Sequence, residues 1–162
     1  MKAVHLGLRH RRSPSLASNF FDPDMPEEWR VAFLLNEQDA LWVSADDPDV
    51  DTVLDELAET PAPVCVVVEA AAWSPAWDAL GETTGHRVIR LDAETPLWRP
   101  DGETHGASVG LLPASDDAAM LREWLERFAA QAPAGAGLFV DGEPPSVATV
   151  DRLRTLAELL GL

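Results

Sequence analysis

The sequence predicts a single α/β domain, residues 1–162, with about six mainly parallel strands that alternate with helices. Three observations lead to this class. Apolar segments of strand length recur between segments with helical periodicity. Some of these segments, such as 64–68, are continuously apolar, which is typical of parallel strands covered on both faces. The chain is also 46% hydrophobic, an ordinary value for a packed globular protein.

The strands are predicted from runs of Val, Leu and Ala that are four to six residues long. They are expected over 3–8, 40–45, 64–69, 87–92, 107–112 and 138–141. Helical segments between them require crossover connections, and these place parallel strands side by side. Only residues 92–107 interrupt the alternation: they contain Pro and Gly without an apolar period, so we expect a loop there.

Helices are expected over 26–36, 48–59, 75–80, 116–131 and 147–160. The last two have the clearest periodicity, with apolar residues at i, i+3, i+4 and i+7. Ser115 and Ser146 stand where N-caps are expected, and Gly161 stands where the final helix should end. Asp47 is expected to cap the second helix and Pro48 to occupy its first position.

Charge and composition exclude several classes of partner. The formal net charge of −16 argues against nucleic acid, whose binding depends on Lys and Arg, and against anionic membrane surfaces. The N-terminal apolar run is too short for a signal peptide, and no stretch approaches the length of a membrane span. The single cysteine, Cys65, lies in an apolar run and is expected to be a buried core residue. We therefore expect a soluble, cytoplasmic protein.

The basic cluster Arg9-His10-Arg11-Arg12 directly follows the first predicted strand. It holds three of the twelve Lys and Arg residues, whereas the segment 31–86 has none and contains twelve acids. A positive site within an anionic surface is where an anionic ligand would bind. The equally plausible alternative is a solvated or salt-bridged turn with no ligand.

Acidic residues end or follow four of the other predicted strands. In parallel α/β folds these carboxyl ends share one edge, at which ligands bind. The acids could hold a divalent cation or act in acid–base chemistry, although loops and helix caps also favour carboxylates. They are Asp46, Glu69, Asp92 and Asp141.

Established catalytic and cofactor motifs are missing from the sequence. It has neither a glycine-rich phosphate loop nor a nucleophile elbow. Zinc is not expected, because no two histidines have the spacing of a zinc motif. The acidic run 46–51 lacks the glycine of a calcium loop, so calcium is not expected either. His10, His105 and Trp98 lie in predicted loops and are the remaining candidates for ligand contact.

Two parts of the chain carry a resemblance to a known family. One is FFDPDMPEEW at 20–29, followed by Asn36-Glu37 and a strand. The other runs from His105-Gly106 through LREW at 121–124 and LFVD at 138–141 to the final helix. These segments resemble the opening and closing motifs of the TIM-barrel family catalogued as domain of unknown function seventy-two.

The chain also departs from that family. GLRHR at 7–11 replaces the glycine-rich turn after the first strand, and the second strand lacks the family's Glu and Asn. The chain is shorter than an eight-fold barrel requires. The resemblance therefore implies an incomplete or contracted βα barrel in which most residues at the carboxyl ends of the strands differ from those of the family. An open doubly wound sheet is the alternative. The family has no settled activity to transfer.

We expect a non-catalytic binding or interaction module with a small-anion site at the carboxyl ends of the strands. The expected ligand-binding residues are Arg9, His10, Arg11, Arg12, Trp98 and His105. The alternative is a metal-assisted or general acid–base hydrolase that uses the four strand-end acids. A homodimer that covers an exposed sheet edge is a further expectation.

Overall fold

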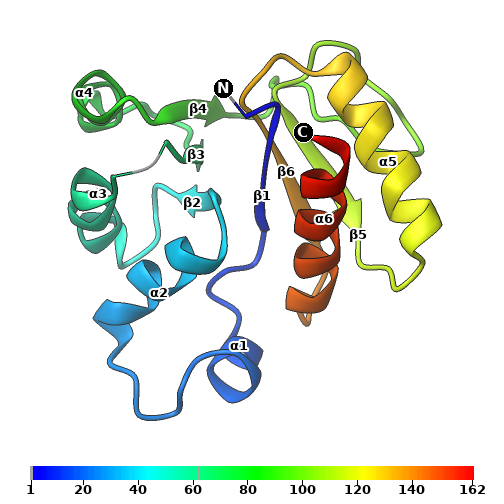
Figure 1. Ribbon diagram of the computed structural model, residues 1–162. Helices are drawn as coiled ribbons and strands as arrows, with labels where there is room; N and C mark the ends of the chain where they lie inside the picture. Colours follow the sequence, from blue (N-terminus) through cyan, green and yellow to red (C-terminus); the bar gives the residue numbers. More distant parts are fainter. Residues whose placement is uncertain (1, 62) are drawn as a thin grey trace.

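A computed structural model describes residues 2–61 and 63–162. Within these residues, strands and helices alternate over nearly the whole chain (Figure 1). The elements are β1 (Val4–Leu8), α1 (Pro14–Asn19), η1 (Glu27–Trp29), α2 (Arg30–Glu37), β2 (Ala40–Ser44), α3 (Val50–Glu59), β3 (Cys65–Glu69), α4 (Pro75–Thr84), β4 (Arg87–Leu91), β5 (Val109–Pro113), α5 (Ala118–Gln131), β6 (Ala136–Asp141) and α6 (Val147–Leu160).

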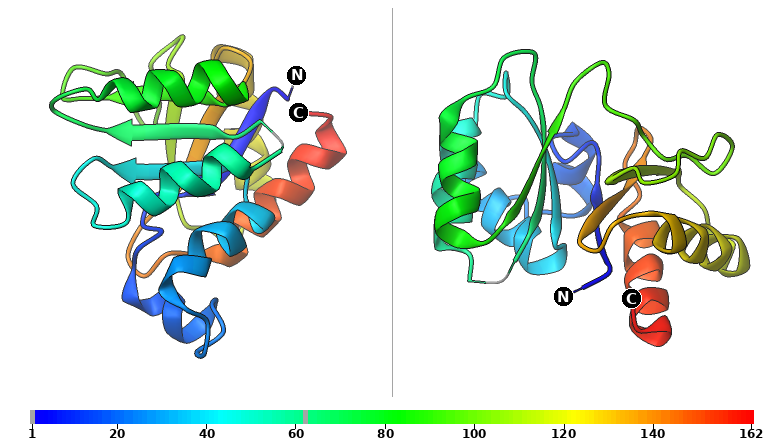
Figure 2. Two further views of the ribbon diagram at one scale, coloured as in Figure 1. Left: turned by 90° about the vertical axis from the view of Figure 1, so that its left-hand side faces the viewer. Right: turned by 90° about the horizontal axis from the view of Figure 1, so that it is seen from above.

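The strands form two three-stranded sheets, in the orders β1-β6-β5 and β2-β3-β4. Every pair of neighbouring strands within a sheet is parallel. The predicted α/β class with six parallel strands is therefore confirmed. Across the described residues the two sheets do not join into a closed barrel. Helices α5 and α6 lie on the outer side of the first sheet, and α3 and α4 lie on the outer side of the second (Figure 2).

Strands β1 and β2 lie side by side, but side chains replace the hydrogen bonds of a normal ladder. The backbone N–H of Leu6 donates to Oδ1 of Asp39 at 2.9 Å, and that of Leu8 donates to Oε1 of Gln38 at 3.1 Å. Between them, Gly7 lies so close to Ala40 that an added Cβ would be 2.2 Å from the Ala40 carbonyl oxygen. The absence of a side chain at residue 7 thus sets the distance between the two sheets.

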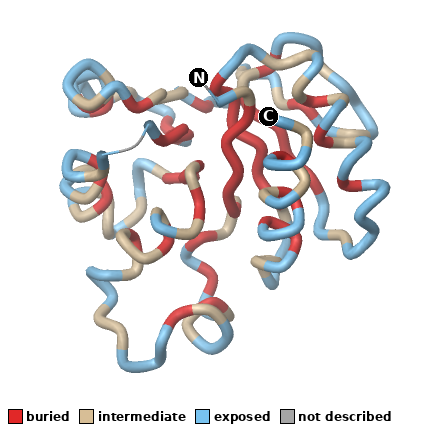
Figure 3. The backbone as a smooth tube through the Cα atoms, viewed as in Figure 1, coloured by how far each residue is buried: buried red, intermediate tan, exposed pale blue. Residues whose placement is uncertain are grey.

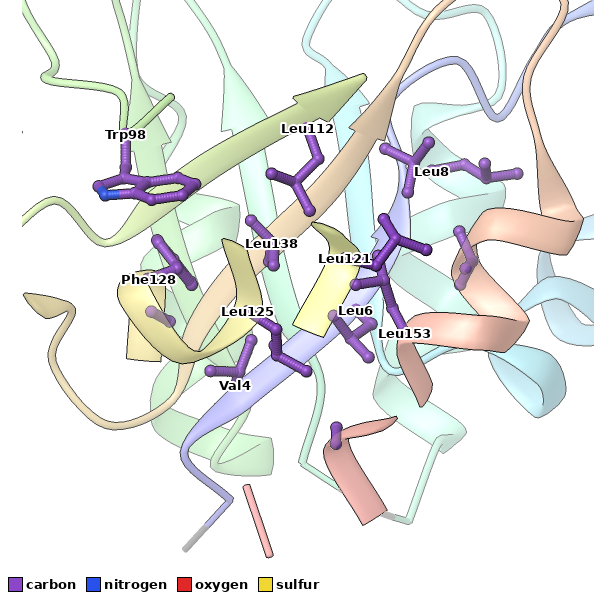
Figure 4. Packing of buried hydrophobic residues seen from close by; sticks show 14 of the residues in the cluster. Val4, Leu6, Leu8, Trp98, Leu112, Leu121, Leu125, Phe128, Leu138 and Leu153 are labelled. Carbon is purple, nitrogen blue, oxygen red and sulfur yellow. The ribbon is translucent and has the colours of Figure 1, made fainter. Parts of the chain in front are cut away.

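Apolar residues form three clusters, and the buried strands run through the centre of the molecule (Figure 3). The largest fills the space between the first sheet and helices α5 and α6 (Figure 4). A second lies between the other sheet and α2, α3 and α4. The third lies between the two sheets and contains Trp42, Cys65, Val67, Leu111 and Phe139, among others. The strands are continuously apolar because both of their faces are covered.

The helix boundaries confirm some of the predicted caps and correct others. The hydroxyl of Ser146 accepts from the Thr149 N–H, and Gly161 has the left-handed conformation of a C-cap, with a φ of 70°. The predicted cap at Ser115 is wrong, because Asp117 caps α5 and Ser115 instead accepts from the Asp117 N–H.

The N-terminal half differs from the prediction at three places. The predicted helix 26–36 divides into η1 and α2. Helix α1 was not predicted, although Ser13 before Pro14 is a helix-start signal. Helix α3 begins only at Val50, with Asp49 as its N-cap, so Asp47 does not cap it. Within the described residues, no helix combines the length and apolar character needed to cross a bilayer.

Asp39, which directly precedes β2, accepts hydrogen bonds from residues at the start of β1. We expect its ionisation to make the stability of the protein depend on pH. Burial raises the pKa of Asp39, but hydrogen bonds from His5, Lys2 and the Leu6 N–H outweigh burial and lower the pKa to about 2. Ionised Asp39 therefore stabilises the fold above its ordinary pKa of 3.8, and this contribution falls as the pH drops toward 2. The contribution is about 2 kcal/mol.

Urea denaturation of the native protein and the Asp39→Asn variant, from neutral pH to acid, measures this contribution. The native protein is expected to be more stable by about 2 kcal/mol near neutral pH, and the difference should shrink below pH 4. A difference that stays constant with pH would show that Asp39 acts through packing rather than charge.

Candidate functional site

The carboxyl ends of the strands form the edge at which most of the predicted residues gather. Arg9 follows β1, Asp46 follows β2, Glu69 ends β3 and Asp92 follows β4. Arg9 and Glu69, which lie in different sheets, line the same two cavities. The two sheets therefore open toward a common edge, the position at which α/β proteins bind ligands.

Two neighbouring cavities occupy this edge. The smaller, of about 330 Å³, is bordered by the turn after β1 and by Glu143. The larger, of about 760 Å³, extends over the ends of β3 and β4. Both volumes lie within or near the range of small-molecule sites. The two cavities share part of one wall, formed by Arg9, Trp42, Ser44 and Glu69.

Arg9 is held in place by an aromatic ring and a carboxylate. Its guanidinium carbon lies 5.3 Å from the ring centroid of Trp42. Its Nη1 donates to both carboxylate oxygens of Asp141, at 3.1 and 3.2 Å. The side chain is 31% exposed, and within the described residues its Nε and Nη2 have no protein acceptor. Arg9 thus offers oriented donors to the cavities.

His10 lies beside Arg9 and shares its partner. Its Nε2 is 3.2 Å from Oδ1 of Asp141, and its side chain is 38% exposed. Burial raises the pKa of Asp141, but the Gly142 N–H, Arg9 and His10 outweigh burial and hold that pKa below its usual value. Asp141 therefore remains ionised at neutral pH and orients both basic side chains.

Arg11 has a different environment from Arg9, and its predicted role as an anion ligand is corrected. Only 6% of its surface is exposed, and its guanidinium donates to other groups of the protein. Its Nε donates to the Trp42 carbonyl at 2.9 Å, Nη1 donates to Asp49, and Nη2 donates to both Asp47 and Asp49. Through these contacts the guanidinium joins the turn after β1 to the loop before α3.

Arg12 reinforces the same connection. Its Nη1 lies 2.9 Å from Oδ2 of Asp49, and its Nη2 lies 3.8 Å from Glu27. Burial raises the pKa of Asp49, but Arg11 and Arg12 outweigh it and lower that pKa. Of the four residues in the basic cluster, Arg9 lines both cavities, whereas His10, Arg11 and Arg12 line only the smaller of the two.

Trp98 is not available for stacking on a ligand, which corrects its predicted role. It is fully buried, and its ring makes an edge contact with Phe128 at 5.3 Å between centroids. Its Nε1 donates to Gln131, and its backbone pairs with β5 near Gly110. Residues 92–107 contain Pro and Gly without an apolar period, so this short extended segment was not predicted.

His105 is exposed and lies away from the cavities, so it does not join the predicted site. It precedes β5, and the adjacent Gly106 N–H donates to the carbonyl of Gln131 at the end of α5. Its position and this hydrogen bond place the segment at the amino end of β5, whereas Arg9 lies at the carboxyl end of β1. His105 and His10, which were predicted to act together, therefore lie at opposite ends of their sheet.

The four acids proposed for catalysis divide between cavities. Asp46, Glu69 and Asp92 line the larger shared cavity. Asp141 lines another hollow of about 750 Å³, together with Arg99 and Trp124. Among the residues that the structure describes, no group of three or more His, Cys, Asp or Glu side chains is arranged to hold a metal ion.

Three residues at the edge were not predicted from the sequence. The ring of Trp42 contacts the guanidinium of Arg9, and its Nε1 donates to Oε2 of Glu69 at 3.1 Å. Ser44 lies in the wall shared by the two cavities, and Glu143 accepts from the hydroxyl of Ser13. Alternation along β2 was the available signal, because residues 40, 42 and 44 share one face of the strand.

No protein-family model matches the chain. No curated protein matches it either.

Proposed function

We propose that the protein is a non-catalytic binding module that recognises an anionic group of a small molecule at the edge cavities. The observation that carries this proposal is the set of contacts made by the Arg9 guanidinium. Asp141 and Trp42 fix its guanidinium, whereas Nε and Nη2 meet no acceptor among the described residues. A fixed guanidinium with two unused donors suits a carboxylate or phosphate.

His10 lies next to Arg9 in the lining of the smaller cavity. Its ring shares Asp141 with Arg9, so both basic side chains contact one carboxylate. Arg11 contributes through the shape of the turn, because its buried guanidinium donates to the Trp42 carbonyl, Asp47 and Asp49, and Arg12 pairs with the same Asp49. We therefore expect anion recognition to depend on Arg9, whose Nε and Nη2 have no acceptor among the described residues.

A hydrolase using the edge carboxylates is the second candidate, favoured by the three acids that line one cavity. A general acid that acts near neutral pH needs a carboxyl group with a raised pKa. Hydrogen bonds from the Glu94 N–H and the Thr95 hydroxyl lower the pKa of Asp92, and the pKa of Asp141 is also lowered. These two acids therefore suit ionic contacts better than proton donation.

We also propose that the fold is a contracted relative of the TIM-barrel family named above. The support is the arrangement of the strands: β1 lies beside β2, so the sheets follow one another as β4-β3-β2 and β1-β6-β5. That is the order of a barrel with its middle strands missing. The apolar cluster between the sheets corresponds to the interior of such a barrel.

The Arg9→Ala variant tests the proposed function. Inorganic phosphate is expected to raise the melting temperature of the native protein, because a ligand that binds only the folded state stabilises it. Arg9→Ala should lose this stabilisation, whereas Arg152→Ala, which removes an exposed arginine from α6, should retain it. Thermal-shift titrations of the three proteins measure the effect. Equal stabilisation of Arg9→Ala and the native protein would contradict the proposal.

A further inference from the structure

The larger cavity has a charge distribution that a simple anion does not match. Arg9 is the only basic residue in its lining, as far as the described residues go. The lining also holds four carboxylates, so a ligand that fills this cavity meets mostly negative charge. These are Asp46, Glu69, Asp92 and Glu94.

Trp42 holds opposite charges at two different parts of its indole. The guanidinium of Arg9 lies over the ring, 5.3 Å from the centroid. The carboxylate of Glu69 accepts a hydrogen bond from Nε1, at the edge of the same ring, with a distance of 3.1 Å. A ring face and a ring edge point in different directions, so the indole keeps the two charged groups apart while placing both in one wall.

Arg9 and Glu69 do not pair with each other. The nearest carboxylate partner of Arg9 is Asp141, and no ion pair joins Arg9 to Glu69 within the described chain. Oε1 of Glu69 likewise accepts no hydrogen bond from the described residues. Both side chains line both cavities, with Ser44 in the same wall. Each therefore has unused hydrogen-bonding capacity and lies in the wall that the two cavities share.

We propose that the ligand is a small zwitterion, whose anionic group binds Arg9 and whose ammonium group binds Glu69. This inference rests on the proposed function, because it adds a second contact to the anion subsite. An ammonium group offers three donors, and the carboxylates of the larger cavity supply the complementary charge. The cavity volumes of about 330 and 760 Å³ accommodate a molecule larger than a bare phosphate ion.

Calorimetric titration with three probes tests this assignment: phosphoethanolamine, inorganic phosphate and ethanolamine. Phosphoethanolamine has both charges, and each of the other two has one. We expect phosphoethanolamine to bind the native protein about tenfold more tightly than phosphate, because it gains the Glu69 contact. In the Glu69→Gln variant most of this preference for phosphoethanolamine should be lost, because the ammonium group loses its charged partner. The matched control, Glu82→Gln, changes an exposed acid on α4 and should keep the native ratio.

The outcomes separate the two proposals. Equal affinities for phosphoethanolamine and phosphate in the native protein would overturn the zwitterion assignment, and so would an unchanged ratio in Glu69→Gln. In either case, phosphate binding that is lost in Arg9→Ala would leave the anion-binding function intact. If neither phosphate nor phosphoethanolamine binds the native protein, the proposed function fails together with the inference.

Discussion

Replacing Gly7 by alanine is expected to lower the free energy of unfolding by about 3 kcal/mol or more. The new Cβ would lie 2.2 Å from the carbonyl oxygen of Ala40 and 3.0 Å from its carbonyl carbon. Both atoms belong to the backbone, so no side chain can rotate to make room. Relief of the clash requires β1 to move away from β2, which also strains the hydrogen bonds that Gln38 and Asp39 make to β1.

Urea denaturation monitored by tryptophan fluorescence measures this effect. Gly102→Ala is the matched control, because an added Cβ at residue 102 meets no atom within 4 Å. The control is expected to change the stability by less than about 0.5 kcal/mol. A Gly7→Ala variant as stable as Gly102→Ala would show that the close contact between β1 and β2 is absent in solution.

Replacing Arg11 by methionine is expected to destabilise the protein by about 3 kcal/mol. The substitution retains much of the side-chain volume but removes the positive charge between Asp47 and Asp49. Those two carboxylates are only 22% and 19% exposed, so each would be left partly buried without its main partner. The Trp42 carbonyl would also lose the hydrogen bond from Arg11 Nε.

The matched comparison is Arg122→Ala, which removes an exposed i,i+4 pair with Glu126 on α5. That change is expected to cost less than about 0.5 kcal/mol in the same denaturation assay. Combining Arg11→Met with Asp47→Asn should recover part of the lost stability, because the carboxylate left without a cation is then removed, whereas Asp49 keeps its ion pair with Arg12. An Arg11→Met variant no less stable than Arg122→Ala would contradict a structural role for Arg11.

Apolar periodicity was sufficient to predict the six strands and the α/β class. The continuous run at 64–68 corresponds to β3, which is covered by helices on one side and by the other sheet on the other side. The contact between Gly7 and Ala40 could not be predicted, because it depends on how closely two distant strands approach. Trp98 was assigned to a loop because residues 92–107 contain Pro and Gly without an apolar period, whereas its burial depends on Phe128 and Gln131 of α5.

Strand order predicted that Arg9 and the strand-end acids would meet at one edge. The sequence does not distinguish Arg9 from Arg11, although they are two residues apart in the same basic cluster. Their side chains point in different directions from the turn: one lies over Trp42 at the cavity wall, and the other enters the loop that contains Asp47 and Asp49. Three-dimensional proximity, rather than local composition, decides which arginine has unused donors.

The NMR signals of the arginine Nε–H groups during a phosphate titration test the central claim most directly. Arg9 Nε has no acceptor among the described residues, whereas Arg11 Nε donates to the Trp42 carbonyl at 2.9 Å. We expect the Arg9 signal to shift in a saturable manner and the Arg11 signal to remain in place. An unmoved Arg9 signal at phosphate concentrations that shift other arginines of the protein would contradict the assignment of Arg9 as the anion-binding residue.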